Sequence, residues 1–139
     1  IPGLFALHAR GWHYVPYKEE ARIGKLRFTH DVGTAGRFAA YRALELYGRS
    51  IVTAHTHRIS YVVEADAEGE AKVSATFGWL GDVEQIDYLQ RVKARSMYVL
   101  GFGIGFVEPH SGVGYLVPVP MGRVKDALTC VVEGRLYHG

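Results

Sequence analysis

At 139 residues, with 48% hydrophobic and 22% charged residues, the chain has the length and composition of one folded domain rather than of a disordered segment. A net charge of +2, without a clustered basic stripe, argues against a dedicated nucleic-acid-binding module. The single cysteine, Cys130, excludes a disulfide framework. The sequence has no uninterrupted apolar run of about 18 residues, so no membrane-spanning helix is predicted.

The first part of the chain, residues 20–58, is predicted to be an α/β unit. Ile23 to Phe28 predicts a strand, Thr34 is the expected N-cap of a helix that Gly48 ends, and Ser50 to Thr53 predicts the next strand. If the two strands are parallel neighbours, the loops that follow them share the edge at which open α/β sheets bind ligands. Apolar residues at helical spacing form the expected buried face of the helix: Ala35, Phe38, Ala39, Ala43 and Leu46.

The second part, residues 59–139, is predicted to be rich in β-strands. Ile59 to Ala65 and Ala71 to Phe77 predict a hairpin, because turn-forming residues separate two β-branched runs. Val83 to Val92 is amphipathic and predicts a short helix. Cys130 is expected to be a buried strand thiol in a cytoplasmic protein. Three further strands complete an expected antiparallel meander: Ser96 to Val107, Gly112 to Val119 and Leu128 to Tyr137.

Three histidines stand at the expected ends of the first two strands. His30 follows one strand, and His55 and His57 follow the other. In an extended backbone the His-x-His spacing places both side chains on one side, within reach of one metal or of two metals about 3.5–4 Å apart. We therefore predict that His30, His55 and His57 are metal ligands. The group is incomplete, since a two-metal hydrolytic centre also needs carboxylates.

The residues beside these histidines have several possible roles. Asp31 would orient a histidine, contact a substrate or form the turn before the helix. Arg58 would contact an anionic ligand or form a surface salt bridge. Thr53 and Thr56 are expected to make local hydrogen bonds, and a helix that begins near Thr34 would direct its positive end toward the His30 loop.

The charge is unevenly divided along the chain. Residues 1–58 carry nine Lys and Arg against four Asp and Glu, and residues 59–139 carry seven against ten, so the two parts have net charges of +5 and −3. Basic charge around the histidines would suit an anionic substrate such as a phosphate ester, and a solvated basic surface has the same composition.

Other conspicuous residues are assigned structural roles. The alternate glycines from Gly101 to Gly105 do not form a dinucleotide-binding fingerprint and are expected to permit close sheet packing or a bend. Four histidines are expected on the surface: His8, His13, His110 and His138. Three aromatic residues are expected in the core: Trp12, Trp79 and Tyr88.

The histidine pattern resembles the C-terminal half of the calcineurin-like metallophosphoesterases. Thr29-His30 closes a strand, a helix and a strand follow, and then comes Ala54-His55-Thr56-His57-Arg58, where the family has Gly-His-Thr/Val-His, often followed by Arg. The segments Phe77 to Asp82 and Gly101 to Gly103 resemble a phage or prophage branch of this family. The resemblance covers residues 20–65 by sequence and the remainder by architecture.

The resemblance implies a four-layer α/β/β/α sandwich with a two-metal site at strand ends. It implies that His30 and His55 bind one divalent metal ion and His57 a second, with Mn, Fe or Zn as the expected metals. The implied reaction is hydrolysis of a phosphate monoester or diester by a metal-bound hydroxide. Asp31 and Arg58 are the candidates for contact with the substrate or the ligands. The substrate is left open among phosphoproteins, nucleotides and nucleic acids.

The sequence also departs from the family pattern. The family's first half supplies Asp-x-His, a bridging Asp in Gly-Asp, and Gly-Asn-His, and none of these precedes the histidine motif here. The chain has no asparagine, and none of its five aspartates is followed at the second position by histidine. Ala54 replaces the usual glycine, and Asp31 stands where the family commonly has glycine. Because the chain also does not start with Met, we expect residues 1–139 to be a partial domain.

Such a partial domain would be inactive alone and would supply the histidine half of the site. Its exposed apolar sheet face would require a separate chain that carries the missing half, or self-association. Two alternatives remain. One is an inert binding or regulatory module with the same fold, and the other is a self-contained site in which three histidines bind a single metal ion.

Overall fold

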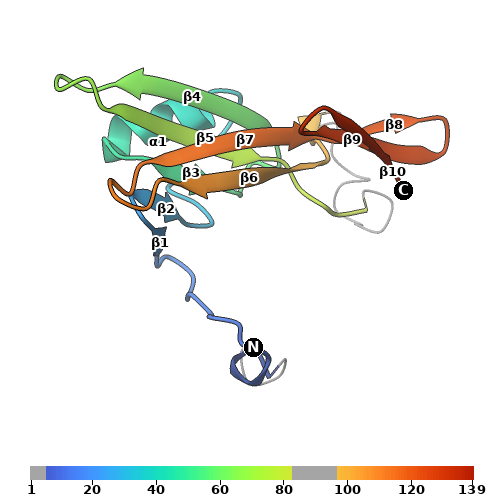
Figure 1. The fold of residues 1–139 in the computed structure, drawn as a ribbon, viewed down its shortest axis with the longest axis horizontal. Coiled ribbons are helices and arrows are strands. Elements are labelled where there is room, and N and C mark those ends of the chain that lie inside the picture. The colour runs from blue at the N-terminus through green and yellow to red at the C-terminus, as the bar shows by residue number, and fades with distance from the viewer. Residues whose placement is uncertain (1–5, 83–96) are drawn as a thin grey trace.

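A five-stranded mixed sheet is the centre of the fold in the computed structural model, which describes residues 6–82 and 97–139 (Figure 1). The strand order is β1-β2-β3-β5-β4, in which β2, β3 and β5 run parallel and the two outer strands run antiparallel. The parallel pairing of the strands that precede the His30 loop and the His55–His57 loop is thus confirmed. The strands are β1 (Ala21–Ile23), β2 (Leu26–Phe28), β3 (Ile51–Thr53), β4 (Ile59–Ala65) and β5 (Ala71–Phe77).

The β4–β5 hairpin confirms its prediction residue for residue. The Asp66 carboxylate organises the turn, because it accepts the backbone N–H groups of Glu68 and Glu70 at 3.1 and 2.8 Å. Gly69 has a φ of +83°, a left-handed conformation that glycine adopts without strain. All of these signals lie within five residues of one another, which is why the sequence predicts this element well.

The single strand predicted from Ile23 to Phe28 is wrong. The chain reverses at Gly24 and Lys25, so that this region forms the antiparallel pair β1–β2. Gly24 has a φ of +58°, and the N–H of Lys25 donates to the carbonyl oxygen of Gly112 at 2.7 Å. The reversal is therefore fixed by a contact with a distant part of the chain.

The helix α1 (Ala39–Tyr47) is shorter than predicted, and the described residues contain no other α-helix. It begins after Phe38, whereas the predicted N-cap, Thr34, lies in the preceding loop and is buried. Gly48 ends the helix as predicted, with a φ of +57° and its N–H donated to the Leu44 oxygen at 2.8 Å. The predicted helix between residues 83 and 92 lies outside the described residues.

The buried face of α1 confirms the predicted face at Ala39 and Ala43 and differs from it elsewhere. Ala35, Phe38 and Leu46 are exposed. The exposed fraction is 60% for Phe38 and 70% for Leu46. The buried residues are Ala39, Ala40, Ala43 and Leu44. Their small side chains let the helix lie close to β3, β4 and β5, which it covers on one face of the sheet.

A two-stranded layer covers the opposite face of the sheet (Figure 1). It consists of β6 (Gly101–Val107) and β7 (Gly114–Pro120), and its core contact is the packing of Leu116 on the sheet. The close approach predicted for the alternate glycines is confirmed, since a Cβ on Gly103 would overlap the ring of Phe77. The hydrophobic cluster between the layers consists of Leu26, Val52, Val73, Ala75 and Leu116.

The C-terminal strands form a separate three-stranded sheet with the order β10-β9-β8. The single strand predicted from Leu128 to Tyr137 is wrong, because the chain turns at Glu133 and Gly134. Cys130 lies on a strand, but it is only partly buried. The three strands are β8 (Gly122–Val124), β9 (Ala127–Val132) and β10 (Arg135–His138).

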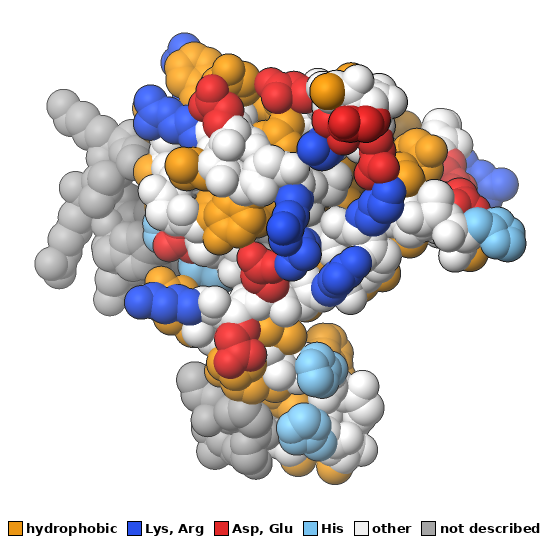
Figure 2. All heavy atoms as spheres, turned by 90° about the vertical axis from the view of Figure 1, so that its left-hand side faces the viewer, with side chains coloured by type: hydrophobic (Ala, Val, Ile, Leu, Met, Phe, Trp, Pro, Cys, Tyr) orange, Lys and Arg blue, Asp and Glu red, His pale blue; other side chains and the backbone are white. Residues whose placement is uncertain are grey.

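The two ends of the parallel strands differ in chemistry. The amino-terminal ends meet at an edge where Lys and Arg side chains gather (Figure 2). The carboxyl-terminal ends lead into the histidine-bearing loops. Within the part of the chain that is described, no helix is long and apolar enough to cross a membrane.

The glycine contact between the layers predicts a difference between two matched variants on β6. Gly103→Ala should lower the free energy of unfolding by about 1–3 kcal/mol, because the added methyl group meets the Phe77 ring. Gly105→Ala should change it by less than about 0.5 kcal/mol, because its Cβ would lie 3.4 Å from Leu116. Urea denaturation of both variants measures the difference. Equal stability of the two variants would show that the glycines do not set the layer spacing.

Candidate functional site

Backbone hydrogen bonds beyond the strand ends bring the His30 loop and the His55–His57 loop together. The Thr29 N–H donates to the Val52 oxygen at 3.1 Å, just past the end of β2. The N–H groups of Ala54 and His55 then both donate to the carbonyl oxygen of His30 at 3.0 Å. The parallel ladder is thus continued into the loops, and the relative position of His30 and His55 is set by backbone hydrogen bonds.

The side chains of His30 and His55 converge. The Nε2 atom of His30 lies 3.4 Å from the Nδ1 atom of His55, and the ring planes are inclined by 77°. Both side chains are exposed. Two nitrogens that each lie about 2.05 Å from a zinc ion at a tetrahedral angle are themselves about 3.4 Å apart. The pair therefore has the spacing of two ligands to one metal ion, and a shared proton between the rings would give a weak hydrogen bond at the same distance.

His57 does not join this pair. Its backbone is left-handed, with a φ of +53°, so the extended geometry assumed for the His-x-His spacing is wrong. Its carbonyl oxygen accepts the Val99 N–H at 3.0 Å. The ring stacks on Trp79 with a centroid separation of 5.2 Å and meets the edge of Tyr98 at 4.8 Å. The spacing in the sequence could not reveal this, because the partner residues lie more than 20 positions away.

The aromatic surroundings change the acid–base properties of His57. Burial of the ring lowers its pKa below the ordinary value of 6.5, and the nearby His55 and His30 lower it further. The Nδ1 atom of His57 is buried and has no hydrogen-bond partner among the described residues. The hydroxyl of Thr56 is also buried and has no hydrogen-bond partner among the described residues, so the local hydrogen bond expected for Thr56 is not seen there. The neutral form of His57 is thus favoured, and this is the form that binds metals.

Asp31 and Arg58 lie next to the histidines in the chain but make structural contacts. The Asp31 carboxylate accepts the Gly33 N–H and forms the turn after β2, which is one of its three predicted roles. The Arg58 guanidinium donates to the sulfur of Met97, and no ion pair of Arg58 occurs among the described residues. The carbonyl oxygen of Arg58 accepts the Gly78 N–H at 2.8 Å and fixes the loop to β5.

A metal centre on the described residues would be open. Residues 6–82 and 97–139 contain no group of three or more His, Cys, Asp and Glu side chains placed to hold a metal ion. The His30–His55 pair fits two positions of a coordination shell, and the remaining ligands would have to come from elsewhere. The self-contained three-histidine site is therefore not favoured by the observed geometry, since His57 is turned away.

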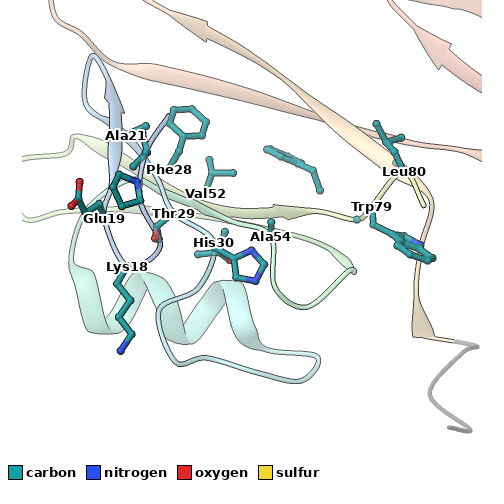
Figure 3. Close-up of a pocket in the computed structure, with 16 residues that line it drawn as sticks. Lys18, Glu19, Ala21, Phe28, Thr29, His30, Val52, Ala54, Trp79 and Leu80 are labelled. Carbon is teal, nitrogen blue, oxygen red and sulfur yellow. The ribbon is translucent and has the colours of Figure 1, made fainter. Parts of the chain in front are cut away.

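His30 also lines a cavity of about 600 Å³ on the side of the sheet opposite α1. Figure 3 shows Phe28, Val52 and Ala54 beside His30, whereas the charged ends of Lys18 and Glu19 are directed away. The cavity wall is thus predominantly apolar. Its volume lies in the range of small-molecule sites, which span about 300–1,000 Å³.

Sequence reasoning missed the aromatic part of this region. Trp79 was expected in the core, but it is half-buried and stacks on His57, while Trp12 is 67% exposed. Tyr88 lies outside the described residues. The surface positions of His8, His13, His110 and His138 are confirmed. The only local signal for the Trp79 contact is its place directly after the β5 strand end, at the same edge as the histidine loops.

No protein-family profile, curated protein or solved structure matches this chain.

The lowered pKa of His57 predicts a dependence of stability on pH. The unfolded chain binds a proton with the ordinary pKa of 6.5, and the folded chain binds it less readily. The free energy of unfolding should therefore fall as the pH is lowered through 6.5 and become level below the folded-state pKa. Urea denaturation of metal-free protein at several pH values measures this, with His57→Asn as the variant that tolerates a left-handed backbone. An unchanged pH slope in His57→Asn would contradict the assignment.

Proposed function

We propose that this chain supplies the histidine half of a metal-dependent phosphoesterase site. The observation that carries the proposal is the 3.4 Å separation of the His30 and His55 ring nitrogens at the carboxyl edge of two parallel strands. This edge is where open α/β sheets place their ligand sites. Two segments, Thr29-His30 and residues 54–58, resemble the calcineurin-like metallophosphoesterases, and this supports the same assignment. The four-layer sandwich of that family is part of the proposal.

The roles of the residues follow from their positions. His30 and His55 would hold one divalent ion, Mn, Fe or Zn, through neutral ring nitrogens. Bound metal ions supply Lewis acidity that lowers the pKa of water and offsets phosphoryl charge. His57 is the proposed ligand of a second ion, and in the structure its ring is stacked on Trp79. The net charge of +5 in residues 1–58 favours the approach of a phosphate ester.

The oxygen ligands are proposed to come from outside the described residues. The Asp31 carboxylate is engaged in its own turn, so it is not positioned as the bridging ligand of two metal ions. A separate chain that carries the missing half, or self-association, would place carboxylates opposite the histidine pair. The apolar cavity beside His30 is consistent with a face that a further layer covers.

A second candidate function is supported by one observation. The described residues bring together no carboxylate with the histidine pair in a metal-holding group. This favours a binding or regulatory module that keeps the fold edge and lacks catalysis. The two candidates differ in whether the histidine pair binds metal ions.

Metal binding by the intact chain tests the proposal. Titration with Zn²⁺ or Mn²⁺, followed by calorimetry and by elemental analysis after dialysis, should show one weak site. His30→Ala and His55→Ala should each reduce the affinity by roughly tenfold or more, because each removes half of the nitrogen ligands. His110→Ala is the matched control, since His110 is an exposed histidine at a different loop.

The results separate the candidate functions. Unchanged metal affinity in His55→Ala would overturn the phosphoesterase proposal, and the absence of metal binding by the unaltered chain would favour the binding module. Hydrolysis of bis(p-nitrophenyl) phosphate should appear only after a carboxylate-bearing partner chain is supplied. Activity that persists in the His55→Ala complex would place the chemistry elsewhere.

A further inference from the structure

A second hollow, with a volume of about 180 Å³, lies at the amino-terminal edge of the parallel strands. Figure 2 shows the Lys and Arg side chains on this face of the molecule. It is formed where β2, β3 and β5 begin, next to the β1–β2 turn. Of its seven lining residues, one is acidic, Glu70, and one carries a hydroxyl, Ser50. The other five are basic: Arg22, Lys25, Arg27, Arg49 and Lys72.

The basic side chains exceed the carboxylates that neutralise them. Within the described residues Arg22 and Arg49 form no ion pair, and the Arg22 Nε atom donates only to the Gly24 carbonyl oxygen at 2.8 Å. The hollow and its ion-pair partners therefore have two positive charges in excess. The three ion pairs are Lys25–Glu70 at 2.6 Å, Arg27–Glu20 at 2.8 Å and Lys72–Asp66 at 3.2 Å.

The strand register concentrates like charges at this place. Arg22 on β1 is directly opposite Arg27 on β2. Like charges in direct cross-strand positions destabilise an antiparallel pair. Arg27 is in turn paired with Ile51 on β3. Arg49 comes two residues before Ile51, so it lies at the same edge of the sheet. Glu20 compensates the charge of Arg27, so a bound anion would offset the charges of Arg22 and Arg49, which form no ion pair among the described residues.

We infer that this hollow binds a phosphate group. Guanidinium groups present planar pairs of N–H donors that match the oxygens of a phosphate, and Arg22 and Arg49 have such donors free of carboxylates. The Ser50 hydroxyl accepts the Val73 N–H at 3.1 Å, which leaves its own O–H to donate. The small volume favours one phosphate group, free or at the end of a small molecule, over a nucleic-acid duplex. The site is independent of the histidine pair and of the proposed hydrolysis.

Calorimetric titration of EDTA-treated protein with inorganic phosphate and with pyrophosphate at low ionic strength tests the inference. The double variant Arg22→Gln/Arg49→Gln should lose roughly tenfold or more in affinity. The matched control, Arg42→Gln/Arg123→Gln, removes two exposed arginines from α1 and β8 and should remain within about twofold of the unaltered chain. Circular dichroism establishes that both double variants are folded.

The outcomes have distinct meanings. Failure of the unaltered chain to bind either anion, or an equal loss of affinity in both double variants, would overturn the inference. Loss of phosphate binding in His55→Ala would place the anion at the histidine edge and also overturn it. A single-stranded oligonucleotide provides the last arm. If it bound with a steep salt dependence while phosphate and pyrophosphate did not, the hollow would be part of a nucleic-acid track instead.

Discussion

The parallel pairing of β2 and β3 is the constraint on which the rest of the structure depends. It aligns two loops that are 25 residues apart, and the backbone hydrogen bonds to the His30 carbonyl extend the alignment past the strand ends. Because both N–H groups of Ala54 and His55 donate to that one oxygen, backbone hydrogen bonds set the relative position of His30 and His55, in addition to the contact between their rings. A substitution of either histidine should therefore alter the chemistry of the edge more than the fold.

The same pairing creates two edges with different ligands. At the carboxyl edge, the ring nitrogens of the histidine pair lie beside an apolar cavity, which suits a metal ion and the uncharged part of a small molecule. At the amino edge, basic side chains come from β1, the β1–β2 turn, β2, the residues just before β3, and β5. The distribution of charge in the sequence, +5 in residues 1–58, reflects the second edge at least as much as the first.

The elements that could be predicted from the sequence are those fixed by neighbouring residues. The β4–β5 hairpin and the end of the helix at Gly48 follow from local turn and cap chemistry. The proximity of the His30 loop and the loop that begins after Thr53 follows from the parallel pairing of the strands before them. The β1–β2 reversal depends on the Gly112 oxygen, and the left-handed turn at His57 carries the Val99 hydrogen bond. Gly112 is 87 positions from Lys25 and Val99 is 42 positions from His57, so no local pattern contains the information.

The distance between the two edges limits what a single ligand can do. From Arg49 to Ala54 the chain advances five residues, mostly along β3, which spans roughly 15 Å in an extended strand. One phosphate group cannot contact both edges. A molecule that engages the arginine hollow and the histidine pair together must be long enough to span the strand. Two separate small anions would instead bind at the two edges without direct contact with each other.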